Sequence, residues 1–147
     1  IKSSLYQLCL KFIEERIETA EIALKQAREA SNDDTKSSAG DKYETSREMM
    51  QQDIDRNKRL LIDAEENQHL LNSLKDIPHS DAARNGSLDI TDQGNFYLSI
   101  SAGQLHIGKD VYFAISAVSP IGKLLLGKIK GDQFDFNGRK YHIKDVV

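Results

Sequence analysis

The chain has 147 residues, of which 39% are hydrophobic and 29% are charged, and its formal net charge is −3 at pH 7. Globular proteins average about 45–50% apolar and about 25% charged residues, so this composition argues against one large compact core and favours an elongated molecule. No apolar run approaches the roughly 18 residues of a membrane helix, and a single cysteine excludes a disulfide framework or a cysteine zinc site. We therefore expect a soluble cytoplasmic protein, and the modest negative charge gives no overall attraction to nucleic acid.

The chain changes character near Pro78. Residues 1–77 carry 12 Lys and Arg against 16 Asp and Glu, a net charge of −4, whereas residues 78–147 carry 8 against 7, a net charge of +1. The first part contains no proline before Pro78 and a single glycine, Gly40. The sequence therefore predicts two domains of different type, with residues 78–86 as the linker between them.

Residues 1–77 show the alternating four- and three-residue spacing that is typical of the a and d positions of a coiled coil. The first series is Tyr6, Leu10, Ile13, Ile17, Ala20, Leu24, Ala27 and Ser31. The second series is Met50, Ile54, Asn57, Leu61, Ala64, Gln68 and Leu71. A polar break over residues 31–40 separates the two, so we expect a long antiparallel helical hairpin.

Acidic residues gather around the break, and the tip of the hairpin is expected at residues 32–44. Asp41 followed by Glu44 is typical of a capping pair, which would begin the second helix at about residue 42. The cluster has two interpretations: a solvated loop with a helix cap, or carboxylates that supply oxygen ligands to Mg²⁺ in a partner's site. Composition does not decide between them.

Residues 87–147 are predicted to form a small α+β domain. The strand-like runs are 88–90, 96–100, 111–118, 133–136 and 140–143. Asn137-Gly138 is a favoured two-residue hairpin turn between the last two runs. Ser119 as N-cap, Pro120 at the first helical position and Gly127 past the end predict one short helix.

Other motifs in the chain give weak signals. Gly122 to Lys128 matches part of a phosphate-binding loop, but Ile129 stands where a Mg²⁺-binding Ser or Thr is needed, so a short packed helix is favoured. The stretch from Asp89 to Asn95 lacks the alternating oxygen ligands of a calcium loop and is better interpreted as a strand followed by a turn. The four histidines are scattered without metal-ligand spacing.

Two segments, Gly-Asp-Lys-Tyr-Glu-Thr at residues 40–45 and the run from Ile115 to Asp132, carry a resemblance to a known family. The first is similar to the Gly-Asp-x-x-Glu-Asn segment of the Gre family of bacterial transcript-cleavage and transcription elongation factors. The second resembles that family's Ile-Ser…Ser-Pro-Ile/Leu…Leu-x-Gly-Lys-x-x-Gly-Asp segment. With the predicted hairpin placed before a small α+β module, the resemblance extends over nearly the whole chain, and it implies an FKBP-like C-terminal domain without prolyl isomerase activity.

The resemblance also implies a function. Gre factors bind at the rim of the RNA polymerase secondary channel through the C-terminal domain and insert the hairpin, whose acidic tip helps to hold the second catalytic Mg²⁺ of the polymerase. The polymerase then cleaves the 3′ end of a backtracked RNA. By position, Asp41 and Glu44 take the metal-assisting role, and Ser119, Pro120 and Ile121 match the segment linked to polymerase docking.

By this resemblance the chain has no self-contained active site, no cofactor of its own, no small-molecule substrate and no membrane partner. Arg47, Lys58 and Arg59 have two interpretations: they steer the RNA end by charge, or they lie on a solvated helix face. Ser119 and Pro120 can likewise serve simply as a helix cap.

Differences from the family keep other functions open. Thr45 stands where the family has Asn, Glu48 stands where it often has Tyr, and Lys42 lies between the two acids of the tip. One alternative is a secondary-channel regulator of RNA polymerase that does not cleave RNA, and a more remote one is a coiled-coil adaptor unrelated to transcription.

Overall fold

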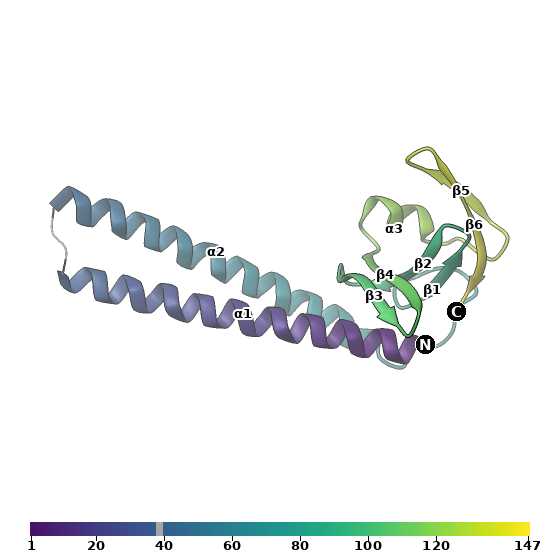
Figure 1. Cartoon of the computed structure of the whole chain (residues 1–147), viewed down its shortest axis with the longest axis horizontal. Helices are drawn as coiled ribbons and strands as arrows, with labels where there is room; N and C mark the ends of the chain where they lie inside the picture. The colour runs from purple at the N-terminus through teal and green to yellow at the C-terminus, as the bar shows by residue number, and fades with distance from the viewer. Residues whose placement is uncertain (38–39) are drawn as a thin grey trace. The chain divides into compact units, whose positions relative to one another are not determined.

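The computed structural model describes the backbone of residues 1–37 and 40–147 and the side chains of residues 1–32 and 45–147. Two long helices come first, α1 (Lys2–Ser37) and α2 (Gly40–Ser73), and an α+β region follows (Figure 1). The α+β region contains, in order, β1 (Leu88–Thr91), β2 (Gly94–Ser99), β3 (Gly103–Ile107), β4 (Asp110–Ser116), α3 (Pro120–Leu125), β5 (Gln133–Phe136) and β6 (Arg139–Val146). The predicted α+β class is therefore confirmed.

The chain divides into two compact units. One unit consists of Ile13–Gln68, which is helical wherever it is described. The other combines Ile1–Phe12 and His69–Val147, so that the first turns of α1 and the last residues of α2 belong with the sheet.

In the helical unit, burial follows the predicted heptad spacing. The side chains of Ala20 and Leu24 on α1, and of Ile54 and Ala64 on α2, are at most 7% exposed. The remaining predicted positions that lie in this unit and are described are buried or half-buried, including Asn57 and Gln68. Each helix therefore carries one narrow covered stripe between exposed, charged faces.

The polar break is shorter than the sequence suggested. The helix α1 continues to Ser37, beyond Ser31 where the break was expected to begin, and α2 begins at Gly40. Polar residues without proline remain compatible with a helix, because only proline both removes the backbone donor and clashes with the preceding turn.

The sheet has six strands in the order β3-β4-β2-β1-β6-β5. Neighbouring strands are antiparallel except β2 and β4, which pair in parallel with Phe96 opposite Phe113 and Ser99 opposite Ser116. The strand β3 makes this parallel pairing possible, because it lies in the connection that returns the chain to the start of β4. Sequence reasoning missed β3, and it extended β4 two residues too far, to Val118.

The hairpin turn between β5 and β6 is confirmed. Asn137 has φ of 49° and Gly138 has φ of 78°, and Phe136 pairs with Arg139 across them. Two successive positive φ values define the type I′ turn that Asn-Gly favours, because its twist matches that of the flanking strands.

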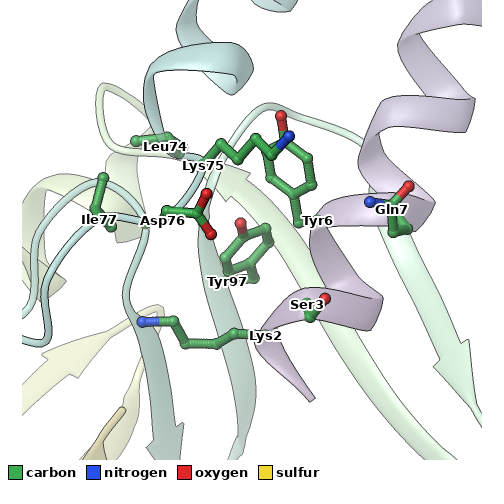
Figure 2. A pocket seen from close by; sticks show the side chains of 10 residues that line it. Lys2, Ser3, Tyr6, Gln7, Leu74, Lys75, Asp76, Ile77 and Tyr97 are labelled. Carbon is green, nitrogen blue, oxygen red and sulfur yellow. The ribbon is translucent and has the colours of Figure 1, made fainter.

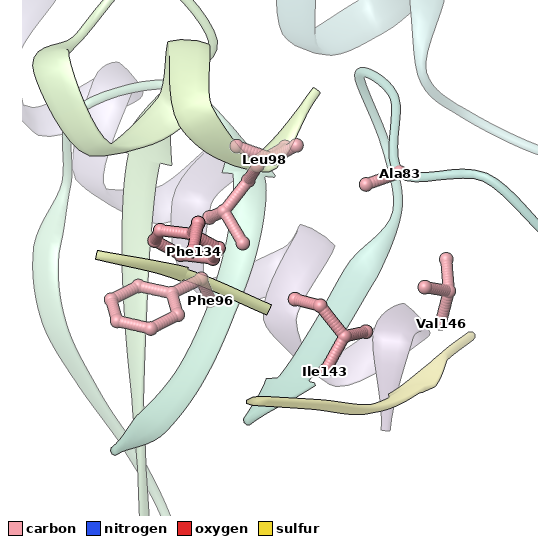
Figure 3. Packing of buried hydrophobic residues seen from close by; sticks show 7 residues of the cluster. Ala83, Phe96, Leu98, Phe134, Ile143 and Val146 are labelled. Atoms are coloured by element: carbon pink, nitrogen blue, oxygen red, sulfur yellow. The ribbon is translucent and has the colours of Figure 1, made fainter. Parts of the chain in front are cut away.

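Both faces of the sheet are covered, as the alternation in β2 shows. Phe96 and Leu98 belong to a cluster completed by Ala83, Leu125, Phe134, Ile143 and Val146 (Figure 3). Tyr97 and Ser99 point to the other face, where Ser99 Oγ lies 3.7 Å from Cys9 Sγ of α1. Since successive side chains of a strand alternate between faces, β2 is a central strand that is buried on both sides.

The segment 78–86, expected as a linker, is built into the sheet-containing unit. Ala83 is 3% exposed; its N–H donates to the carbonyl of Lys128 at 2.8 Å, and its own carbonyl accepts from Gly127 N–H at 2.8 Å. Two such hydrogen bonds and a buried side chain fix the segment beside the residues that follow α3.

Candidate functional site

The predicted docking segment forms a tightly hydrogen-bonded turn between β4 and α3. Ser119 has the extended conformation of an N-cap residue, with φ of −68° and ψ of 159°, and its Oγ accepts a hydrogen bond from Gly122 N–H at 3.1 Å. The same hydroxyl donates to the carbonyl of Ser116 at 2.6 Å. Pro120 follows at the first helical position, where no backbone donor is needed. The turn is therefore held by Ser119, while Pro120 stays exposed.

Gly122 allows this turn to close. Its position is buried, and a Cβ atom there would overlap the carbonyl oxygen of Ser116 and lie 2.8 Å from Ser119 Oγ. Real Cβ atoms are almost never found so close to other atoms, so any larger residue must displace the backbone. The glycine is needed here for close approach of two backbone segments.

The short helix α3 buries one face and exposes large apolar side chains at both ends. Ile121, Leu124 and Leu125 have the i, i+3, i+4 spacing of a single helix face, and all three pack in or against the core cluster. Val118 before the helix is 76% exposed, and Leu126 and Ile129 after it are 41% and 49% exposed. The signal for them in the sequence is an apolar run longer than one face of a six-residue helix can bury.

A buried carboxylate on β1 was not anticipated. Asp89 is fully buried, Ser87 Oγ lies 2.8 Å from its Oδ1, and its Oδ2 has no hydrogen-bond partner in the described part of the chain. Burial raises the pKa of Asp89 from 3.8 to about 6, although the Ser87 hydroxyl and the nearby Lys2 ammonium lower it.

The side chains of Asp41 and Glu44, to which the metal-assisting role was assigned, lie outside the described residues. Arg47, Lys58 and Arg59 are on α2 and exposed. Within residues whose side chains are described, none of these three forms an ion pair, whereas Arg56 pairs with Asp53 at 2.8 Å on the same helix. The three cations are thus free to meet an external charge.

Two general properties can be stated for the described residues. No group of three or more His, Cys, Asp or Glu among them is arranged to hold a metal ion. No helix among them combines the length and apolar character that crossing a bilayer requires.

Comparison with known proteins gives no match: no protein-family model fits the chain, and no curated protein is similar to it.

Proposed function

We propose that this chain is a Gre-like transcription elongation factor that binds RNA polymerase at its secondary channel and stimulates cleavage of backtracked transcripts. The observation that carries the proposal is the pair of helices, 36 and 34 residues long, placed before a small α+β unit. At 1.5 Å per residue each helix is about 50 Å long, a length suited to reaching into a deep channel. The covered stripes of α1 and α2 support an antiparallel coiled coil, and we assign the α+β unit to the FKBP-like class.

In this proposal the α+β unit supplies the docking surface. The rigid Ser119–Pro120 turn presents Pro120 and Val118 to solvent, and the exposed Leu126 and Ile129 extend the apolar surface available to the polymerase. Ile121 packs beneath the turn against the core and supports it. A surface that is held in place before binding loses less conformational freedom when it binds.

The acidic residues Asp41 and Glu44 would complete a metal site of the polymerase. Carboxylate oxygens are ligands that Mg²⁺ accepts, and the chain brings no cofactor of its own. In two-metal hydrolysis the ions activate the attacking water and stabilise the leaving oxygen. The exposed Arg47, Lys58 and Arg59 are placed on α2, where they could attract the RNA end by charge. A factor of this kind acts in the cytoplasm.

Neutralising the two acids tests the cleavage function. With Asp41→Asn and Glu44→Gln combined, we expect the rate of transcript shortening in backtracked complexes to fall at least about tenfold, because a weakly held Mg²⁺ loses its added ligands. The matched control is Asp63→Asn, which removes one charge from an exposed position of α2 and should leave the rate unchanged. Wild-type protein that binds polymerase but shortens no RNA would contradict the cleavage function and favour the non-catalytic regulator, for which the differences at Thr45 and Glu48 speak.

A second variant tests docking separately. Val118→Asp places a charge on the exposed turn and should weaken binding to RNA polymerase about tenfold, because that charge must lose its water in the interface. Lys109→Ala changes the net charge by the same amount at the exposed β3–β4 turn and should bind normally. Binding can be measured by competition for the polymerase. If the wild-type chain does not bind polymerase at all, the coiled-coil adaptor becomes the better interpretation.

A further inference from the structure

A small pocket lies in the unit that contains the sheet (Figure 2). Its walls come from the first turns of α1, from the residues that follow α2 and from β2, and its volume is about 230 Å³. Since one water molecule occupies about 30 Å³ of liquid, the pocket has room for a small molecule but not for a nucleotide or a peptide.

Tyr97 is the residue that marks this pocket as a binding site. The residue is 2% exposed, and its ring passes through the sheet-side wall so that the hydroxyl reaches the pocket, beside Tyr6 and Asp76 (Figure 2). Among the described residues the Tyr97 hydroxyl has no hydrogen-bond partner. Buried hydroxyl groups in native proteins almost always have a partner, because leaving one without a partner is costly. The pocket is the place from which that partner must come.

The hydroxyl of Tyr97 remains a neutral donor. Burial, with the neighbouring Cys9 and Tyr6, raises the pKa of Tyr97 to about 12. The group therefore keeps its proton at any physiological pH and can donate it to an acceptor oxygen. The Tyr6 hydroxyl lies at the opposite wall and offers a second donor (Figure 2).

The charges around the pocket select the kind of acceptor. Lys2 and Lys75 contribute two ammonium groups and Asp76 one carboxylate, so the lining carries a net charge of +1. Lys2 is partly desolvated: burial and the nearby Arg84 lower its pKa. A single negative charge would balance the lining, whereas a dianion would be repelled by Asp76. The apolar side chains of Leu74 and Ile77 line the same space and suit a hydrocarbon body.

We propose that this pocket binds a small organic monocarboxylate. Its carboxylate accepts hydrogen bonds from the hydroxyls of Tyr6 and Tyr97 and from the ammonium of Lys75, and its apolar part packs on Leu74 and Ile77. The inference does not rest on the proposed function, because none of these residues belongs to the docking turn or to the acidic segment.

Binding can be tested with benzoate, which is small enough for the pocket and carries one negative charge. In ¹H–¹⁵N spectra of the full chain, titration with benzoate should shift the amide signals of Lys75, Asp76 and Tyr97 saturably, with a Kd on the order of 1 mM. Benzamide, its neutral counterpart, and inorganic phosphate should cause no saturable shift at the same residues. No saturation by benzoate, or equal binding of benzamide or phosphate, would overturn the proposal.

Two variants assign the contacts. Tyr97→Phe removes only the hydroxyl and should weaken benzoate binding at least about fivefold, as should Lys75→Gln at its exposed position. The matched control is Tyr112→Phe, which removes a hydroxyl from the neighbouring region of the sheet, on β4, outside the pocket lining. Tyr97→Phe should unfold at the same denaturant concentration as wild type or a higher one, because it removes a buried group without a partner. Unchanged benzoate affinity in both pocket variants would overturn the assignment.

Discussion

Replacing Gly122 with alanine is expected to destabilise the chain by about 3 kcal/mol, a large part of the 5–15 kcal/mol that holds a typical domain folded. The added methyl group would overlap the carbonyl oxygen of Ser116 and lie 3.0 Å from Ala117 Cα. Both contacts are with backbone, so a rotamer change cannot relieve them. The N-cap hydrogen bond from Gly122 N–H to Ser119 Oγ must lengthen, which removes about 1 kcal/mol of helix stabilisation.

Urea unfolding followed by circular dichroism measures this effect as a lower midpoint at an unchanged slope. Lys123→Ala is the matched control, since it alters the next position of α3 at an exposed side chain and should change stability by less than about 0.5 kcal/mol. If Gly122→Ala and Lys123→Ala unfold at the same urea concentration, the close approach of the two backbone segments is not structurally required. Under the proposed function, Gly122→Ala should also weaken polymerase binding, because the turn that presents Val118 would move.

Replacing Asp89 with leucine is expected to remove a pH-dependent loss of stability from the wild-type chain. The pKa of Asp89 is about 6 in the folded state and 3.8 in its ordinary state. Between these pH values the unfolded chain releases this proton while the folded chain keeps it, so the free energy of unfolding falls as pH rises. The loss is complete above about pH 6 and amounts to about 3 kcal/mol, whereas below about pH 4 it is absent.

The test compares wild type and Asp89→Leu by urea unfolding at pH values from about 3.5 to 7.5. The difference in free energy of unfolding, variant minus wild type, should grow by about 3 kcal/mol across the range. Ser87 should tolerate the change, because its hydroxyl also lies 2.8 Å from the carbonyl of Arg84 and can donate its single proton there. Asp135→Leu at an exposed position of β5 is the control, and its difference from wild type should stay nearly constant with pH. A constant difference for Asp89→Leu would mean that its carboxylate ionises normally in the folded chain.

Much of the fold could be predicted because local chemistry and tertiary packing agree. The long helices followed from apolar spacing and the absence of proline, and the β5–β6 turn followed from Asn137-Gly138. Ser119, Pro120 and Gly127 marked the ends of α3, which the structure places at Pro120–Leu125. In each case a few adjacent residues carry the information, since caps and tight turns are fixed by their own dihedral angles and hydrogen bonds.

The features that were missed depend on contacts between distant residues. The strand β3 is short, lies between Gly103 and Gly108, and sits at an edge of the sheet with mostly exposed side chains, so it lacks an apolar signal of its own. Asp89 is buried because β1 lies between β2 and β6, and an aspartate in a strand gives no local sign of this. The pocket combines residues near both ends of residues 1–77 with Tyr97, and the exposure of Val118 appears only when α3 is seen to be too short to cover it.

The position of β1 also has a consequence for how the chain reaches its native state. It pairs with β2 through a tight turn, but its other neighbour, β6, follows about fifty positions later along the chain. Phe134, Ile143 and Val146, which cover Phe96 and Leu98, belong to β5 and β6 and are therefore made last by the ribosome. During synthesis β2 must wait with its apolar side chains uncovered, and closure of β1 on β6 is a slow, non-local step. The early helices can form as they emerge, whereas the sheet becomes a protected structure only when its final strand arrives.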